Sequence, residues 1–359
     1  MANDIRSVLG QIRQDLRNRM ITLPRLDRGE PRINYEVDER AGQIVLRAVL
    51  PPGILEKNLQ GDDASVATFL VCVGYWWNQR HPEVRVKCEI VEDRIKESEP
   101  GEEDDDARHR RRSLFVLEQY RELLGECRFE YMLKQSPAAK FWSGIQKPVM
   151  NYPVAKRKDE PSAGSERALG KELCARWKTD SKFRKSFPID SNSAPVELNE
   201  QFPVGLFASE VATKNQWTPA RGSQVDLWGA SPDGNILHLF ELKKDENTKA
   251  GIIPESLYYA CLLAHVRSPA AEEKRPVVSW NDKSDGPKWA GAIAARRAKK
   301  TVMWLLAPSF HPLVYLNGRT PLEWLNPGLA KCGIELRVLH LRLDESKHAE
   351  GWGPSWPTP

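Results

Sequence analysis

The sequence predicts an α/β protein in which a mixed-sheet domain, residues 156–359, follows a separate α+β domain, residues 1–155. Apolar residues recur at helical spacing in some segments and alternate with polar residues in others, so helices and strands intermingle along the chain. Residues 154–164 combine a basic run with Pro, Ser and Gly, as a linker would. At 359 residues the chain is long enough for two hydrophobic cores.

The composition narrows the class of protein. With 40% hydrophobic and 28% charged residues, the chain resembles an ordinary globular protein. The formal net charge of +4 permits nucleic-acid binding without requiring it. Six cysteines without a C-x-x-C pair argue against a zinc site and a disulfide framework. No segment resembles a signal peptide or reaches the roughly 18 apolar residues of a membrane span, so we expect a cytoplasmic protein that contacts no membrane.

The first domain alternates between helix-like and strand-like segments. The predicted elements are a helix at 4–19, a hairpin of 33–37 and 44–48, a helix at 63–77, a strand at 84–90 and a helix at 114–124. The acidic block 97–106 and the basic block 108–112 predict a solvated insertion. No metal-ligand spacing, phosphate-binding glycine loop or nucleophile elbow occurs here, so the sequence does not reveal what this domain does. It could recognise a target or a protein partner.

The second domain begins with a helix that Ser165 would cap. The predicted elements are a helix at 166–178, a strand at 201–210, a hairpin within 224–244, a helix at 252–266 and strands at 300–307 and 334–343. The strand at 300–307 is a continuous apolar run, which is typical of a buried strand. The tail at 351–357 is expected to be poorly ordered.

The hairpin is the most informative stretch. Asp233-Gly234 is a strong signal for a type I′ turn, in which both central residues have φ > 0. Pairing around this turn places Asp226 directly opposite Glu241, with Cβ atoms roughly 4.5–5.5 Å apart. Lys243, two residues beyond Glu241, projects from the same face. The residues between them face an apolar layer: Ile236, His238, Phe240 and Leu242.

This arrangement favours metal chemistry. Two carboxylates facing each other repel, unless a cation lies between them. Mg²⁺ prefers hard oxygen ligands, typically one or two carboxylates with waters and substrate phosphate. A lysine beside such a metal can orient or deprotonate a water, or neutralise a phosphate. Asp226, Glu241 and Lys243 therefore predict a metal-dependent phosphodiesterase, against the alternative of an amphipathic hairpin that carries charges for solubility.

The Asp and Glu-Leu-Lys residues resemble the signature of the PD-(D/E)xK nuclease superfamily, which includes many restriction enzymes. The resemblance covers roughly residues 160–345 and implies a restriction-endonuclease-like core. It implies that Asp226 and Glu241 bind metal, with the carbonyl of Leu242 as a further ligand. It also implies a catalytic role for Lys243.

One position departs from the signature. Val225 stands where the signature has a proline, a position that varies in the superfamily. A literal Pro232-Asp233 lies nearer the Glu-Leu-Lys, but Ser-Pro-Asp-Gly-Asn is turn chemistry and would place Asp233 at a loop tip. We therefore take Asp226 as the site aspartate.

Helix residues supply the remaining candidates. Nucleases of this superfamily often contribute a further Glu from the first core helix, and Glu166 matches that role, with Glu172 as the alternative. A Glu in a first helical turn is also favoured by the helix dipole alone. The start of the helix at 252–266 resembles the helix after the Glu-x-Lys strand in some of these nucleases, which makes Glu255, Ser256 and Tyr259 further candidates.

The resemblance implies a nuclease that uses Mg²⁺, with Mn²⁺ as a substitute, and that cleaves DNA as an endonuclease in bacterial restriction or phage defence. Two alternatives stay open. The substrate could be RNA, or the chain could be a nucleic-acid-binding or scaffolding module on a degenerate nuclease fold. The sequence is compatible with a homo-oligomer and does not reveal sequence specificity or an activating partner.

Overall fold

A computed structural model describes most of the chain between residues 34 and 341. The described residues are 34–40, 43–50, 53–56, 66–92, 105–132, 141–142, 145, 147–150, 165–219, 223–244, 251–267, 278–280, 290–311, 313–315 and 318–341. The predicted helix at 4–19, the linker at 154–164 and the tail at 351–357 lie outside these residues, as does most of the acidic block.

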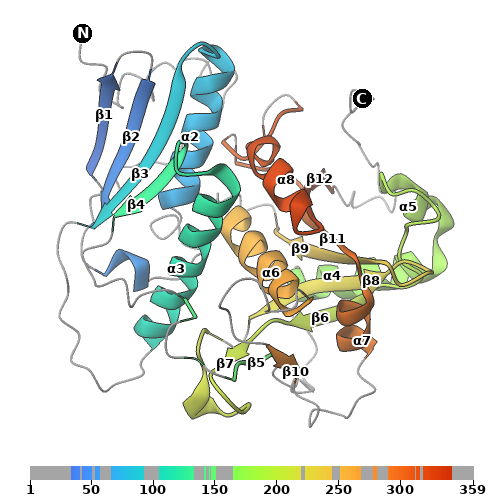
Figure 1. The fold of residues 1–359 in the computed structure, drawn as a ribbon. Coiled ribbons are helices and arrows are strands. Elements are labelled where there is room, and N and C mark those ends of the chain that lie inside the picture. Colours follow the sequence, from blue (N-terminus) through green and yellow to red (C-terminus); the bar gives the residue numbers. More distant parts are fainter. Residues whose placement is uncertain are drawn as a thin grey trace. The chain divides into compact units, whose positions relative to one another are not determined.

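The chain is mixed α/β with several sheets and divides into two compact units (Figure 1). The first unit comprises Met1–Phe141, Lys249–Pro254 and His311–Gly328, and the second comprises Trp142–Thr248, Glu255–Phe310 and Leu329–Pro359. The expected boundary between residues 155 and 156 thus falls within the second unit, and two later segments group with the first.

The first unit contains a four-stranded sheet in the order β1-β2-β3-β4. Its strands are β1 (Asn34–Arg40), β2 (Gln43–Leu50), β3 (Arg85–Glu92) and β4 (Phe129–Met132). The hairpin β1–β2 is antiparallel, whereas β2–β3 and β3–β4 are parallel. Tyr35 pairs with Ala48 and Val37 with Leu46, which confirms the predicted hairpin.

Two helices accompany this sheet, α2 (Val66–Arg80) and α3 (Asp105–Leu124). Both helices were expected, but α3 begins earlier than predicted. The prediction of a solvated insertion is therefore wrong for the basic block at 108–112, which is helical. Asp105 and Asp106 occupy the first turn of α3, where the helix dipole favours negative charge. Arg110 donates to both carboxylate oxygens of Glu92, at 2.9 and 3.1 Å, and Arg112 is buried. The contact of Arg110 with Glu92 on β3 therefore helps to stabilise the charge block as a helix.

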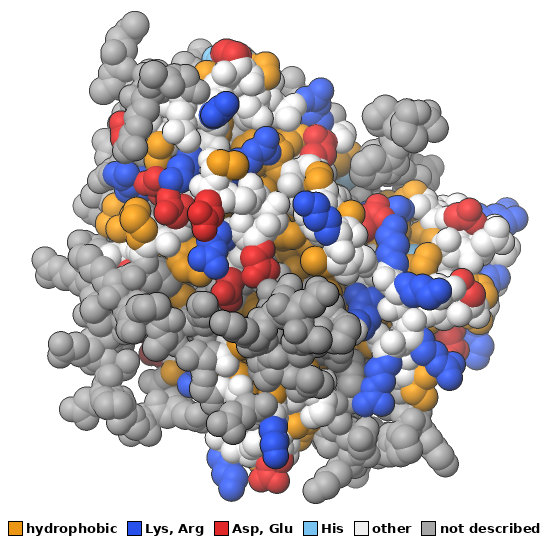
Figure 2. Space-filling model, in the orientation of Figure 1, with side chains coloured by type: hydrophobic (Ala, Val, Ile, Leu, Met, Phe, Trp, Pro, Cys, Tyr) orange, Lys and Arg blue, Asp and Glu red, His pale blue; other side chains and the backbone are white. Residues whose placement is uncertain are grey.

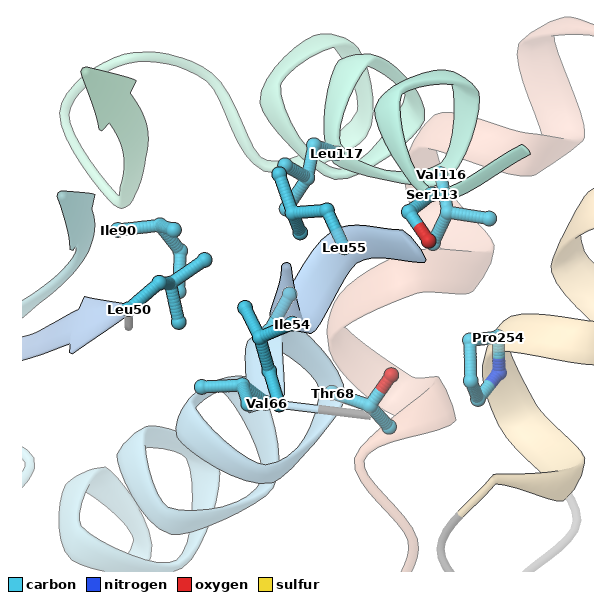
Figure 3. Close-up of a pocket in the computed structure, with 11 residues that line it drawn as sticks. Leu50, Ile54, Leu55, Val66, Thr68, Ile90, Ser113, Val116, Leu117 and Pro254 are labelled. Atoms are coloured by element: carbon cyan, nitrogen blue, oxygen red, sulfur yellow. The ribbon is translucent and has the colours of Figure 1, made fainter. Parts of the chain in front are cut away.

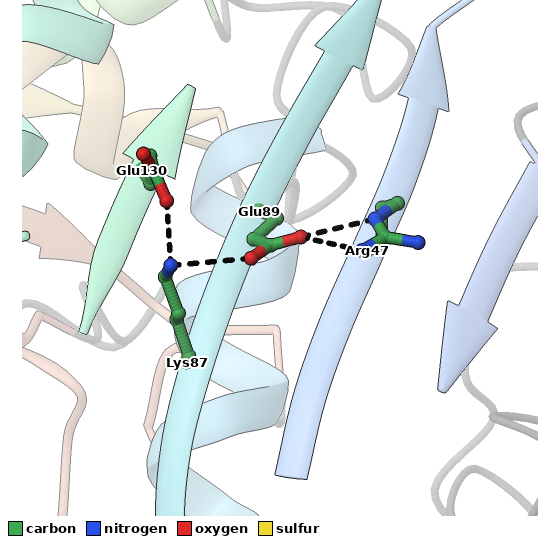
Figure 4. A network of polar contacts seen from close by, with 4 residues as sticks. All are labelled: Arg47, Lys87, Glu89 and Glu130. Carbon is green, nitrogen blue, oxygen red and sulfur yellow. Dashed lines mark hydrogen bonds and ion pairs between the residues drawn. The ribbon is translucent and has the colours of Figure 1, made fainter. Parts of the chain in front are cut away.

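A network of charged side chains crosses three strands of this sheet (Figure 4). Arg47 on β2 donates to Glu89 on β3 at 3.0 and 2.8 Å. Lys87 lies 3.2 Å from Glu89 and 2.5 Å from Glu130 on β4. Burial opposes ionisation of Glu89, but the hydrogen bonds from Arg47 and Lys87 outweigh burial and lower its pKa. The network is cross-strand pairing that stabilises the sheet.

The second unit contains a five-stranded mixed sheet in the order β12-β11-β9-β8-β6. Its strands are β6 (Asn199–Pro203), β8 (Gln224–Ala230), β9 (Ile236–Leu242), β11 (Lys300–Ala307) and β12 (Ile334–His340). Strand β11 is parallel to both β9 and β12, and β8 is antiparallel to β6 and β9. The predicted strands at 300–307 and 334–343 are confirmed, the second ending at His340.

Helix α4 (Glu166–Thr179) covers one face of this sheet. Ser165 accepts a hydrogen bond from Ala168 N at 3.1 Å, which confirms the predicted cap. A Cβ added at Gly170 would lie 3.3 Å from Leu227 Cδ2, so the helix approaches β8 closely at this glycine. The core on this face includes Leu173, Trp177, Leu227, Phe240, Leu242 and Trp304.

Among the described residues, the remaining elements are four helices, two 3₁₀ turns and the strands of a small third sheet. They are α5 (Ser181–Ser186), α6 (Ile252–Arg267), α7 (Ala290–Arg297), α8 (Leu322–Lys331), the 3₁₀ turns η1 (Ile54–Glu56) and η4 (Thr213–Asn215), and the strands β5 (Val149–Met150), β7 (Leu206–Phe207) and β10 (Ser279–Trp280). Helix α6 was predicted. No helix within the described ranges is long and apolar enough to cross a membrane.

The predicted strand at 201–210 is wrong in its extent. The strand β6 ends at Pro203, which has no N–H to donate to a sheet. The chain then leaves the large sheet, and β7 pairs with β5 in a three-stranded sheet of order β10-β5-β7. The apolar run therefore serves two sheets, a division that its periodicity does not reveal.

The hairpin turn also differs from the type I′ turn expected. Gly234 has φ of +70°, but Asp233 does not have positive φ. Gly234 N donates to Ser231 O at 2.9 Å, with Pro232 as the second residue of the turn. Pro favours that position, and Asp233 accepts from Ser231 Oγ and Asn235 N at 2.6 and 2.9 Å. The loop is longer than expected, yet the register of the strands is the predicted one.

We expect Asp233→Ala to lower stability slightly and to leave the candidate site unchanged. The substitution removes three hydrogen bonds, from Ser231 Oγ, Asn235 N and the Asn235 side chain, at an exposed turn where water replaces the lost partners. Chemical denaturation of both proteins would measure the difference. A loss as large as that from truncating a buried core side chain would show that Asp233 does more than shape the turn.

Candidate active site

The strands β8 and β9 position the three predicted residues of the signature. Leu227 pairs with Phe240 and Gly229 with His238, so the next position in the register places Asp226 opposite Glu241. Phe240 and Leu242 lie in the core beneath α4. Because side chains alternate along a strand, Asp226 and Glu241 project from the opposite face of the sheet.

Short contacts join the candidate residues on this face. Lys243 Nζ lies 2.5 Å from Glu241 Oε1 and 3.3 Å from Glu255 Oε2. Asp226 Oδ2 accepts a hydrogen bond from Leu242 N at 2.8 Å. We call Asp226, Glu241, Lys243 and Glu255 the carboxylate–lysine cluster. Its members come from β8, from the end of β9 and from the first turn of α6.

Burial dominates the electrostatics of the cluster. The side chains of Glu241, Lys243 and Glu255 are 3–5% exposed. Burial raises the pKa of Asp226 to about 7, and the nearby Glu166 and Glu255 also raise it. Burial, followed by the charge of Glu255, raises the pKa of Glu241 well above its ordinary value. Both carboxyl groups therefore favour a proton or a cation beside them.

Lys243 keeps its charge in this setting. Burial alone would lower the pKa of Lys243, but the carboxylates of Glu241, Glu255 and Asp226 outweigh burial and raise it. The side chain is therefore an ammonium at neutral pH. Of the roles considered for this lysine, neutralising a phosphate or orienting a water suits an ammonium, whereas deprotonating a water does not.

The charges within the cluster do not balance. Glu241 and Glu255 contact the Lys243 ammonium, and the charge of Lys243 also acts on Asp226. Among these four residues, full ionisation would leave an excess of two negative charges. Glu241 Oε2 is buried and has no hydrogen-bond partner among the described residues. An unsatisfied carboxylate oxygen beside excess negative charge fits a site for a cation.

The residues fit a magnesium ion through two carboxylates. No group of three His, Cys, Asp or Glu side chains within the described ranges is arranged to hold a metal ion. Mg²⁺ needs fewer protein ligands, because it usually keeps several waters and is held by one or two carboxylates with substrate phosphate. Asp226 and Glu241 supply such a pair. Leu242 contributes its backbone N–H to Asp226, and its side chain belongs to the core.

The two helix carboxylates lie in different surroundings. Glu166, in the first turn of α4, is partly buried and close enough to Asp226 to raise its pKa. Glu172 is exposed and forms an ion pair with Arg176 at 3.0 Å. Glu166 is therefore the helix carboxylate that accompanies the cluster, and Glu172 is a surface residue.

The first turns of α6 bring further polar groups. Tyr259 donates to Glu255 Oε1 at 3.1 Å, and the Ser256 hydroxyl is buried without a hydrogen-bond partner among the described residues. Tyr258 donates to Thr218 at 2.8 Å, away from the cluster contacts. The sequence signal for Glu255 was the resemblance of the helix start to the helix after the Glu-x-Lys strand in some nucleases. Its ion pair with Lys243 could not be predicted from that resemblance.

A cavity in the first unit contains none of these residues (Figure 3). Its volume is about 20 Å³, room for roughly one water molecule. Apolar side chains dominate its lining, among them Leu50, Ile54, Val66 and Ile90. The cavity is therefore a packing void and does not compete with the carboxylate–lysine cluster as a site.

The face drawn in Figure 2 carries side chains of both charges. Figure 2 shows acidic and basic side chains intermingled on the visible face, in keeping with the net charge of +4. Comparisons of the chain with protein-family models, curated proteins and solved structures found no match. The inference of function therefore depends on the geometry of the cluster and on the sequence pattern.

Proposed function

We propose that this protein is a divalent-metal-dependent nuclease that hydrolyses phosphodiester bonds, with a restriction-endonuclease-like core in the second unit. The observation that carries the proposal is the meeting of Asp226, Glu241 and Lys243 on one face of β8–β9. There carboxylates outnumber the single ammonium, and Glu241 Oε2 is buried without a hydrogen-bond partner in the part of the chain that the structure describes. A cation held by Asp226 and Glu241 would balance that excess.

The protein side chains have distinct roles in this proposal. Asp226 and Glu241 hold Mg²⁺ or Mn²⁺, with the Leu242 carbonyl as a further ligand. The bound metal would polarise the scissile phosphate and help activate a water. Lys243, as an ammonium, neutralises charge that develops on the phosphate during attack. Glu166 and Glu255 accompany these groups, and Glu255 forms an ion pair with the Lys243 ammonium.

DNA is the favoured substrate, and restriction or phage defence in the bacterial cytoplasm is the favoured setting. Both the substrate and the setting follow only from the resemblance to the PD-(D/E)xK superfamily, and no contact within the structure bears on them. On the same basis, the N-terminal residues would recognise a target or a partner.

We expect the purified chain to cleave DNA in Mg²⁺ or Mn²⁺ and to be inactive in EDTA. Supercoiled, linear and single-stranded DNA, with an RNA of matched length, would be incubated with each metal and followed by gel electrophoresis. Conversion of supercoiled DNA would identify an endonuclease, and cleavage of RNA alone would change the substrate. Intact substrates under every condition would contradict the proposal, and retained binding would then favour the scaffolding alternative.

A further inference from the structure

Gln201 has an unusual backbone conformation. Its φ is +54°, and it is the one non-glycine residue with positive φ among the described residues. Positive φ is uncommon for residues other than Gly, Asn, Asp and His. Such conformations cluster at functional sites, where the surrounding structure maintains them.

The position of Gln201 connects this conformation to the carboxylate–lysine cluster. Glu200 pairs with Leu227 and Phe202 with Val225, so the register places Gln201 directly opposite Asp226. Residues opposite each other in antiparallel strands have Cα atoms about 4.5–5.5 Å apart. Strand β6 is the outermost strand on this side of the described sheet, and Gln201 is partly exposed.

The backbone at Gln201 reverses the faces of the strand. Burial raises the pKa of the Cys174 thiol on α4, and the charge of Glu200 raises it further. Glu200 therefore lies on the side of the sheet that α4 covers. The Phe202 ring contacts the Trp228 ring at 5.7 Å, and Trp228 shares the face of Asp226. Glycine would adopt this conformation without steric cost. Packing of the backbone therefore does not explain why glutamine occupies the position.

The side chain offers a neutral hydrogen-bond donor at this place. The Gln201 carboxamide has no hydrogen bond to any described residue. A carboxamide N–H can bind a phosphate oxygen without neutralising the metal ligands.

We propose that Gln201 positions the substrate, its carboxamide donating a hydrogen bond to a phosphate oxygen of the nucleic-acid strand beside the scissile phosphate. The inference rests on the proposed function and adds a residue that binds substrate outside the metal ligands. It applies equally to DNA and RNA, since the two have the same phosphate groups.

The test compares Gln201→Gly, Gln201→Glu and the control Asn199→Gly in the full-length protein. We expect Gln201→Gly to melt at the same temperature as the wild type or higher, because glycine accepts positive φ. We expect its KM for a short labelled duplex to rise about 10- to 100-fold, the range for a lost hydrogen bond to a charged group. Gln201→Glu keeps the size of the side chain but repels phosphate, so its KM should also rise.

The control separates substrate binding from strand structure. Asn199 lies two residues earlier on β6 without positive φ, so Asn199→Gly should lower the melting temperature with little change in KM. Unchanged KM in both Gln201 variants of an active nuclease would overturn this inference alone. A wild type that cleaves no nucleic acid would overturn the proposed function and this inference with it.

Discussion

Replacing Lys243 with methionine should reduce the rate of cleavage by at least about 100-fold, the loss expected when one charged donor is removed from a transition state. Methionine approximates the length of the lysine stem and removes only the ammonium. The buried Lys243 Nζ contacts Glu241 and Glu255 at 2.5 and 3.3 Å. Without it, the carboxyl group of Glu241 can take up a proton, since burial already raises the pKa of Glu241.

Lys244→Met is the matched control for this experiment. Lys244 is the next residue in the chain and is exposed, so the same substitution there should retain activity within about threefold, a difference of less than 1 kcal/mol. Single-turnover cleavage would measure both rates, and circular dichroism would verify folding. Wild-type rates in a folded Lys243→Met protein would show that Lys243 takes no part in the mechanism. They would favour the alternative that the hairpin carries its charges for solubility.

Replacing Asp226 with asparagine should stabilise the metal-free protein by roughly 1–3 kcal/mol at pH 8, since a pKa difference of one unit corresponds to about 1.4 kcal/mol. Burial raises the pKa of Asp226 from 3.8 to about 7. Between these values the folded state binds the proton more tightly than the unfolded state does. The contribution of Asp226 to the free energy of unfolding therefore falls as pH rises from about 4 to about 7, and stays low above that.

Asparagine should avoid this loss at high pH. Its carbonyl oxygen can still accept the hydrogen bond that Leu242 N donates to Asp226 at 2.8 Å. Thermal melts in EDTA from pH 5 to pH 8 should thus show a smaller decline for Asp226→Asn than for the wild type. A mutant that is less stable than the wild type at pH 8 would contradict the repulsive, desolvated site.

Metal should reverse the order of the two proteins. Mg²⁺ that binds only the folded state stabilises it by RT ln(1 + [L]/Kd), or about 2.7 kcal/mol at one hundred times Kd. Asp226→Asn removes a charge and an oxygen ligand, so its melting temperature should respond much less. Asp233→Asn, a substitution at the exposed turn, should respond as the wild type does. Equal responses in the wild type and Asp226→Asn would show that Asp226 is not a ligand.

Several elements could be predicted from local pattern. Centring the hairpin on Asp233-Gly234 predicted the register of β8 and β9, even though the turn type was wrong. A shift of one residue would have exposed Phe240 and Leu242 and buried their polar neighbours, so one register is strongly favoured. Ser165 and the apolar stripe of α4 likewise specified that helix.

Other features depended on partners far away in the chain. The bidentate pair between Arg110 and Glu92 helps hold a charge block in a helix. The apolar run after Gln201 divides between two sheets, because β5 lies elsewhere in the sequence. Neither the helix at the charge block nor the division of the apolar run can be predicted from a short stretch of sequence, since each depends on which segments pack together.

For the candidate site, the sequence by itself determined the pairing of Asp226 with Glu241 and the face that Lys243 shares with them. Only the tertiary structure decided that Glu255 reaches Lys243, that Glu166 and not Glu172 approaches Asp226, and that Gln201 lies opposite Asp226 with positive φ. The physical reason is that the register of a hairpin follows from the position of its turn, and the face of each side chain from local alternation. Burial and the convergence of charges arise only when helices and an edge strand, distant in sequence, pack onto the hairpin.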